Sequence, residues 1–163
     1  SEMNYFFGIK SHNTVVFDDL EPMPRISRFL FGNWPKSNKI YSGTNKNNQI
    51  FFETSYTCKY GYHSRKIITS INGKNWIIED FISGYKNMAI LRWRLIASEW
   101  IIHENVIENK IARIKISASK VISSINIVKG WESEFYDSKN EIDTLEIKLE
   151  ESPSKIITNI VFK

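Results

Sequence analysis

The sequence predicts an all-β protein: a large antiparallel two-sheet β-sandwich with at most one short helix. Three observations support this prediction, namely strict alternation of apolar and charged residues, a hairpin signature, and many short β-rich runs without a long helical period between them. A chain of 163 residues that is 42% hydrophobic is long enough to bury a proper core. We therefore expect residues 1–163 to form a single β-sandwich domain.

Alternation is clearest in the segment DTLEIKLE. It places Leu145, Ile147 and Leu149 on one face of an extended chain and charged side chains on the other. The segment ARIKIS repeats the pattern with Ile114 and Ile116. A period of two residues is typical of a strand that is buried on one face only, so both segments are predicted strands of a sandwich.

A hairpin is predicted within RKIITSINGKNWIIEDF, where two β-rich runs meet at Asn72 and Gly73. Asn-Gly is the pair that a two-residue type I′ turn prefers, because both central residues need a positive φ. Further strands are expected at residues 49–57, 88–95, 100–107, 121–128 and 155–162. Only PRISRFLFGNW suggests a short helix or a covering loop.

The charge pattern limits the classes of partner. The net charge is +4 and the isoelectric point is near 9.1, but the Lys and Arg residues are scattered among acidic ones. Nucleic-acid binding usually requires a concentrated basic stripe, so we expect no nucleic-acid partner, whereas an acidic polysaccharide remains compatible. No apolar run is long enough for a membrane span. The single cysteine, Cys58, has no activating neighbour in sequence and is expected to be inert.

Motifs of a self-sufficient enzyme are missing from the sequence. It contains no glycine-rich phosphate loop, no nucleophile elbow and no paired-ligand zinc spacing. We therefore expect no catalytic residue in this chain.

Four segments, in order along the chain, resemble the heparinase II/III-like family of polysaccharide lyases. NYFFGIKSHNTVVFDD is similar to a family segment in which an aromatic pair and a glycine precede a His-Asn-Thr strand. YGYHSRKI is similar to its Tyr, His and Arg run, WIIEDFISG to its Glu-Asp strand end, and KGWESEFYDSKNEIDTLEI to its Trp-x-Ser-x-x-Tyr segment. The chain would then be most of the C-terminal β-sandwich, of the supersandwich type.

The resemblance implies a parent protein with an upstream helical toroid domain that cleaves uronate-containing acidic polysaccharides by β-elimination. The catalytic base and acid of the family lie mainly outside the part that this chain matches, so the chain is expected to be inactive alone. Where the family often has an Arg after the aromatic pair, this chain has Phe7. A polar contact to the substrate is therefore expected to be missing.

The resemblance also implies a metal ligand. In several family members the His of the His-Asn-Thr step binds zinc together with a His and an Asp from earlier strands, and His12 matches that position. Zinc accepts such a ligand set. We expect zinc only in the full-length parent and no tightly bound metal in this chain, in which we favour a His12 that fixes the start of a strand through a hydrogen bond.

Substrate-binding candidates are Tyr62, His63 and Arg65. Aromatic rings stack on sugar faces, and an Arg can pair bidentately with a uronate or a sulfate. The alternative is a junction between a loop and a strand with an exposed polar face. For the nearby Trp93 we expect core packing, with Arg92 and Arg94 on the opposite face of its strand, solvated or ion-paired.

Two functional hypotheses remain open at this stage. The first is the C-terminal domain of a lyase, periplasmic or extracellular according to the resemblance, with an acidic polysaccharide as substrate and the upstream helical domain as partner. The second is a noncatalytic carbohydrate-binding or structural β-sandwich. In the first case the surface that meets the helical domain would be exposed here and would favour self-association.

Overall fold

The computed structural model describes residues 2–135 and 138–163, with the side chains of 2–4 left out. The described elements begin with a short helix, α1 (Glu2–Phe7), and a 3-10 turn, η1 (Ile9–Ser11). The strands are β1 (Val15–Phe17), β2 (Lys36–Ser37), β3 (Tyr41–Thr44), β4 (Ile50–Cys58), β5 (Gly61–Thr69), β6 (Asn75–Ser83), β7 (Ala89–Arg94), β8 (Ile101–His103), β9 (Val106–Glu108), β10 (Ala112–Ala118), β11 (Ile122–Glu132), β12 (Asn140–Leu149) and β13 (Ser154–Phe162).

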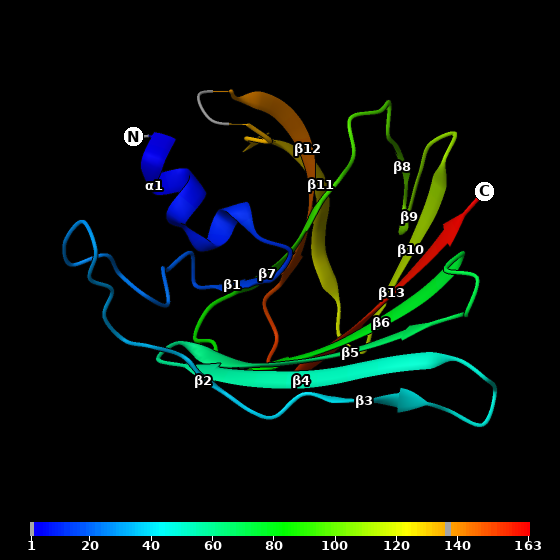
Figure 1. The fold of residues 1–163 in the computed structure, drawn as a ribbon, viewed down its shortest axis with the longest axis horizontal. Helices are drawn as coiled ribbons and strands as arrows, with labels where there is room; N and C mark the ends of the chain where they lie inside the picture. Colours follow the sequence, from blue (N-terminus) through cyan, green and yellow to red (C-terminus); the bar gives the residue numbers. More distant parts are fainter. Residues whose placement is uncertain (1, 136–137) are drawn as a thin grey trace.

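These strands form two antiparallel sheets that face each other (Figure 1). The small sheet has the order β1-β7-β12-β11. The large sheet has the order β2-β4-β5-β6-β13-β10-β9-β8, and β3 pairs with β4 beside β2. The predicted all-β, two-sheet sandwich is confirmed. In Figure 1, α1 and the loop of residues 20–35 lie at the end of the molecule where β1 and β7 are found.

The core lies between the two sheets and is supplied by alternating residues. Leu145, Ile147 and Leu149 of β12 in the small sheet are fully buried. Ile114 and Ile116 of β10 in the large sheet belong to the same core. Apolar burial of this kind stabilises a fold by roughly 25 cal/mol per Å². The alternation read from the sequence therefore gave the correct inward faces of β10 and β12.

Two local predictions need correction. The hairpin of β5 and β6 is confirmed, but its turn is not type I′, because only Gly73 has a positive φ (+68°) and the loop spans residues 70–74. The carboxamide of Asn72 accepts hydrogen bonds from Ser70 Oγ and Lys74 N instead. Local side-chain bonding has thus replaced the tight turn.

Residues 100–107 do not form one strand. β8 and β9 form a hairpin instead, which turns at Glu104 (φ +53°). For residues 24–34, where the sequence suggested a short helix or a covering loop, the covering loop is confirmed, and an isolated bridge between Arg25 and Phe31 closes it. The short helix lies earlier, at α1.

Candidate functional site

The site is built around residues 11–14, which connect η1 to β1 and contain the His-Asn-Thr step. Both sheets hold this segment. From the large sheet, Arg65 Nη1 donates to the backbone oxygen of Asn13 at 2.6 Å. From the small sheet, the backbone N–H of Arg94 donates to Oδ1 of Asn13 at 2.6 Å, and Arg94 Nη1 donates to the backbone oxygen of Ser11 at 3.1 Å. The segment is therefore fixed at the junction of the two sheets.

A polar cluster lies beneath the segment, on the inner face of the large sheet. Asp80 of β6 is fully buried, and its Oδ1 lies 2.6 Å from Nε2 of His63 and accepts a hydrogen bond from Nε of Arg65 at 2.7 Å. The three residues meet because β5 and β6 pair Arg65 with Asp80, while His63 precedes Arg65 by two positions on the same face. We call His63, Arg65 and Asp80 the inner triad.

Aromatic rings enclose the inner triad on two sides. The ring of Tyr56 packs edge-on against His63 with a centroid distance of 5.4 Å, and the guanidinium carbon of Arg65 lies 4.5 Å from the ring centroid of Trp93. Burial raises the pKa of Tyr56, although its contact with Thr14 acts in the opposite direction. The Tyr56 phenol thus stays protonated at neutral pH.

His12 is not part of the inner triad. Its side chain is exposed and lines a pocket of about 370 Å³, together with Phe7, Thr14, Glu21 and Tyr56 among others. The Tyr56 hydroxyl lies 3.4 Å from Thr14 Oγ1, so one tyrosine touches both the pocket and the inner triad. Tyr56 therefore connects the pocket that His12 lines to the inner triad.

The described residues do not complete a zinc site. Within 2–135 and 138–163 no group of three His, Cys, Asp or Glu side chains is placed to hold a metal ion. Glu21, the carboxylate among the lining residues of the pocket, accepts the backbone N–H of Ile9 with both oxygens at 3.0 Å. A metal at His12 would need ligands from outside the described residues.

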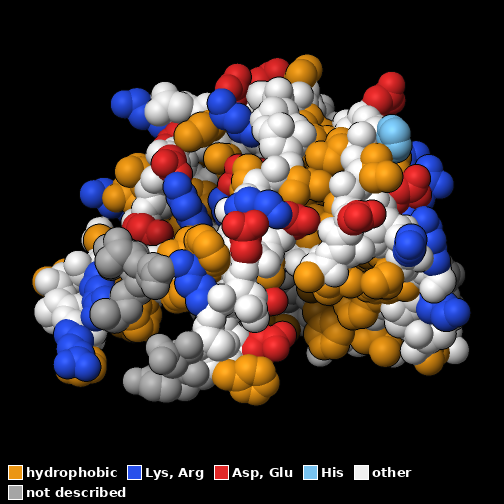
Figure 2. Space-filling view, turned by 90° about the horizontal axis from the view of Figure 1, so that it is seen from above, with side chains coloured by type: hydrophobic (Ala, Val, Ile, Leu, Met, Phe, Trp, Pro, Cys, Tyr) orange, Lys and Arg blue, Asp and Glu red, His pale blue; other side chains and the backbone are white. Residues whose placement is uncertain are grey.

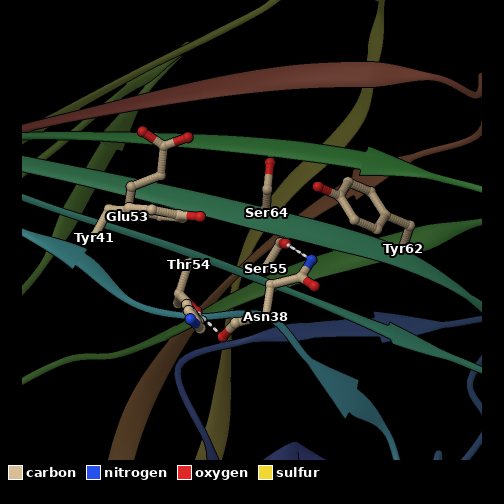
Figure 3. A pocket seen from close by; sticks show the side chains of 8 residues that line it. Asn38, Tyr41, Glu53, Thr54, Ser55, Tyr62 and Ser64 are labelled. Atoms are coloured by element: carbon tan, nitrogen blue, oxygen red, sulfur yellow. Dashed lines mark hydrogen bonds between the residues drawn. The ribbon is translucent and has the colours of Figure 1, made fainter.

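The structure separates the three candidate binding residues. His63 and Arg65 lie together in the inner triad, where His63 is 4% exposed. Tyr62 points to the opposite, outer face of the large sheet, where it lines a separate pocket with Ser55 and Ser64 (Figure 3). The two-residue period of a strand predicts this separation, because it places Tyr62 on the opposite face from His63 and Arg65.

Asp80, Tyr56 and Asn13 were missed as parts of the site. Asp80 stands in the Glu-Asp pair of WIIEDFISG, but only strand pairing shows that it faces Arg65. The expectation for Trp93 is confirmed, since its ring packs against the core. Arg92 is buried and paired with Glu146. Cys58 is a free thiol that packs against the core.

Phe7 stands where the resemblance implies an Arg, and the side chain of another Arg, Arg25, lies next to it. The guanidinium carbon of Arg25 lies 4.9 Å from the centroid of the Phe7 ring. Tyr136 of the Trp-x-Ser-x-x-Tyr segment lies outside the described residues.

The surface carries no concentrated basic area on the face seen in Figure 2, where Lys and Arg alternate with Asp and Glu. Among the described residues, no helix is long and apolar enough to cross a membrane. Large exposed apolar side chains gather in the segment of residues 20–34, which includes Ile26, Phe29, Leu30 and Trp34. We call this segment the apolar loop.

Comparison with known proteins decides the family. The family model described as heparinase II/III-like, C-terminal matches residues 1–158. The chain belongs to the heparinase II/III-like family and corresponds to its C-terminal region. The resemblance carried by the four sequence segments is thereby confirmed.

Solved structures agree with this assignment at the level of the fold. A heparinase III gene product superposes with a TM-score of 0.76 at 14% identity, over 98% of this chain and 25% of that chain. A second heparinase III gives 0.71 at 18% identity, over 97% and 24%. A mutant of the heparan sulfate lyase HepC from Pedobacter heparinus gives 0.70 at 16% identity, over 98% and 25%. A search of curated protein sequences finds no match.

This chain therefore spans about a quarter of the length of the heparinase structures that it matches.

Proposed function

We propose that this chain is the C-terminal β-sandwich of a polysaccharide lyase that acts on uronate-containing acidic polysaccharides. The observation that carries the proposal is the family match over residues 1–158. In this proposal the whole enzyme is periplasmic or extracellular, and a helical domain outside this chain supplies the base and the acid of the β-elimination.

The reaction requires removal of the proton next to a uronate carboxylate, followed by loss of the 4-linked sugar. Such a step needs a neutralised carboxylate and a positioned Tyr or His base. In this proposal the role of the present chain is to position residues 11–14, which include His12. The inner triad and Arg94 hold residues 11–14 in one conformation, and this conformation exposes His12 toward the pocket that it shares with Tyr56.

A zinc ion bound by His12 belongs to the same proposal, with its remaining ligands outside this chain. A neutral imidazole is a suitable zinc ligand, and the exposed His12 side chain is accessible to a partner domain. Metal analysis of the whole enzyme should show less zinc in a His12→Ala variant. The matched control is His103→Ala, an exposed His on β8, which should retain the zinc of the parent.

The apolar loop is the surface that we propose for contact with the helical domain. Its large apolar side chains are mostly exposed to solvent, with Phe29 exposed by 86% and Trp34 by 70%. Large exposed apolar patches are rare on soluble monomers and often mark a surface that contacts another domain. Sedimentation of this chain alone should show self-association, and Phe29→Ser should reduce it. A strict monomer at high concentration would contradict this assignment.

The activity test compares two proteins. This chain and the whole enzyme are incubated with heparan sulfate, chondroitin sulfate, hyaluronan and alginate, and the absorbance of unsaturated uronate is followed. Activity in the whole enzyme alone supports the lyase proposal. If the whole enzyme is inactive on every substrate while this chain still binds sugar, the noncatalytic module is the better description.

A further inference from the structure

A second pocket lies on the outer face of the large sheet, on the far side from the inner triad. It has a volume of about 310 Å³ and lies where the edge of the sheet changes from β2 to β3 (Figure 3). Its lining residues are Asn38, Lys39, Tyr41, Glu53, Thr54, Ser55, Tyr62 and Ser64. The family assignment gives no role to this pocket, which we call the outer groove.

A bulge in the edge of the sheet creates the outer groove. Ser37 pairs with Tyr56, and the N–H of Asn38 donates to the backbone oxygen of Ser55 at 2.8 Å. Tyr41, however, pairs with Glu53. Two residues, 39 and 40, therefore stand opposite the single residue 54. Such an extra residue bends an edge strand and redirects its side chains, and this opens the hollow.

The polar groups of the outer groove are partly fixed before any ligand binds. Nδ2 of Asn38 donates to Ser55 Oγ at 2.7 Å, and Thr54 Oγ1 donates to the backbone oxygen of Asn38 at 3.5 Å. Ser64 stands beside Ser55 because β4 and β5 pair these two residues. Preorganised hydroxyl and amide groups lose little entropy on binding, so they suit a ligand with many hydroxyl groups.

Aromatic rings lie at both ends of this polar floor. Figure 3 shows Tyr62 at one end and Tyr41, beside Glu53, at the other. The Tyr41 side chain is 64% exposed, whereas Tyr62 is held by an edge contact with Phe81 at a centroid distance of 6.2 Å. Aromatic rings offer a large apolar face at low entropic cost. Rings that flank hydroxyl and amide groups match a sugar ring, which has apolar C–H faces and polar edges.

The charges in the outer groove select among sugars. Lys39 and Glu53 are its charged lining residues, and Lys66 lies 3.9 Å from Glu53 across the strand pair. The positive charge is therefore not concentrated, and a densely sulfated chain would lack the cation cluster that binding sulfates requires. The groove fits hydroxyl-rich sugar residues without sulfate.

We propose that the outer groove, with Tyr41 and Tyr62 as its aromatic contacts, is an auxiliary carbohydrate-binding site for unsulfated sugar residues. Tyr62 and His63 are neighbours on β5 with opposite orientations, so the site is separated from the inner triad by the sheet itself. Binding there requires no elimination chemistry. The inference therefore goes beyond the proposed lyase function and stands or falls independently of it.

The test is a titration of this chain, without any other domain, with an unsulfated heparosan hexasaccharide and with a heparin hexasaccharide of the same length. Backbone amide shifts in an NMR spectrum are expected to change on β3, β4 and β5. Tyr41→Ala is expected to weaken heparosan binding roughly tenfold, which corresponds to about 1.4 kcal/mol. Tyr62→Ala should do the same, and Tyr62→Phe, which keeps the contact with Phe81, should weaken binding less.

Phe135→Ala is the matched control, because Phe135 is 73% exposed, close to the 64% of Tyr41, but lies in another part of the chain. It should bind as the parent chain does. Three results would overturn the proposal: no heparosan binding, binding by the Tyr41→Ala and Tyr62→Ala variants as tight as that of the parent chain, or tighter binding of heparin that disappears with salt. The titration measures binding and not turnover. An inactive whole enzyme would therefore not contradict heparosan binding at the outer groove.

Discussion

The guanidinium of Arg65 joins a buried carboxylate to the segment that carries His12: Nη1 donates to the backbone oxygen of Asn13 at 2.6 Å. Nε of the same side chain donates to Asp80 at 2.7 Å. The Arg65 side chain thus links Asp80 of the large sheet directly to residues 11–14.

Asp80→Asn should destabilise the fold strongly. The change removes the charge that Arg65 and His63 share, and leaves a mostly buried guanidinium without its anion. Breaking a buried ion pair on one side costs about 3–5 kcal/mol. Urea unfolding followed by tryptophan fluorescence would measure this loss.

Glu53→Gln is the matched control for Asp80→Asn. Glu53 also loses a cationic partner, Lys66, but both side chains are exposed. An exposed pair contributes only about 0–1 kcal/mol. Equal losses of stability in the two variants would contradict the structural role of the inner triad.

Arg65→Lys keeps the charge and should still loosen residues 11–14. A lysine ammonium lacks the planar fork that reaches both Asp80 and Asn13 while covering the ring of Trp93. We expect the amide of Arg94, which donates to Asn13, to exchange with solvent more than tenfold faster, whereas amides in the β10 and β13 pair keep their protection. Unchanged exchange at Arg94 would show that the segment is held by other contacts.

Sequence patterns predicted the parts of this fold that depend on period and composition. The inward faces of β10 and β12 follow from alternation alone, and the all-β class from the number of such runs. Contacts between side chains on different strands were harder to predict from the sequence. The predicted turn at Asn72 and Gly73 does place Asp80 opposite Arg65, but nothing local in the sequence connects Arg65 to Asn13, and the edge bulge at residues 39–40 has no sequence signature that we can identify. Tyr62 was grouped with His63 because neighbours in sequence were treated as neighbours in space.

Asp18→Asn should flatten the acid end of the stability profile. Burial acts to raise the pKa of Asp18, but the backbone N–H groups of Lys86, Met88 and Asn87 outweigh it and lower the pKa below its ordinary value of 3.8. A lowered pKa contributes stability that is present above the unfolded value and is lost as the pH falls through the folded one. The parent chain should therefore lose stability below about pH 4, and the variant should lose less over that window.

The control for Asp18→Asn is its neighbour. Asp19→Asn removes an exposed carboxylate that pairs with Lys10 and has no backbone amide partners among the described hydrogen bonds. Thermal unfolding from pH 7 to pH 2.5 should leave its acid slope close to that of the parent. The same slope in both variants would assign the acid sensitivity to other groups.

Gly61→Ala should destabilise the sandwich at the point where β5 passes under β1. A Cβ at this position would lie 2.7 Å from Cε1 of Phe17 and 2.9 Å from the backbone oxygen of Ser83. Phe17 is buried and cannot turn aside, so the backbone has to shift. Overpacking of this kind costs about 1–3 kcal/mol.

The control is Gly43→Ala on the edge strand β3. Its Cβ meets only the ring of Phe51 at 3.1 Å, which can give way, so the loss of stability measured by urea unfolding should be smaller. If Gly61→Ala instead unfolds at the same urea concentration as the parent, then β1 is not packed against β5 as tightly as this contact requires.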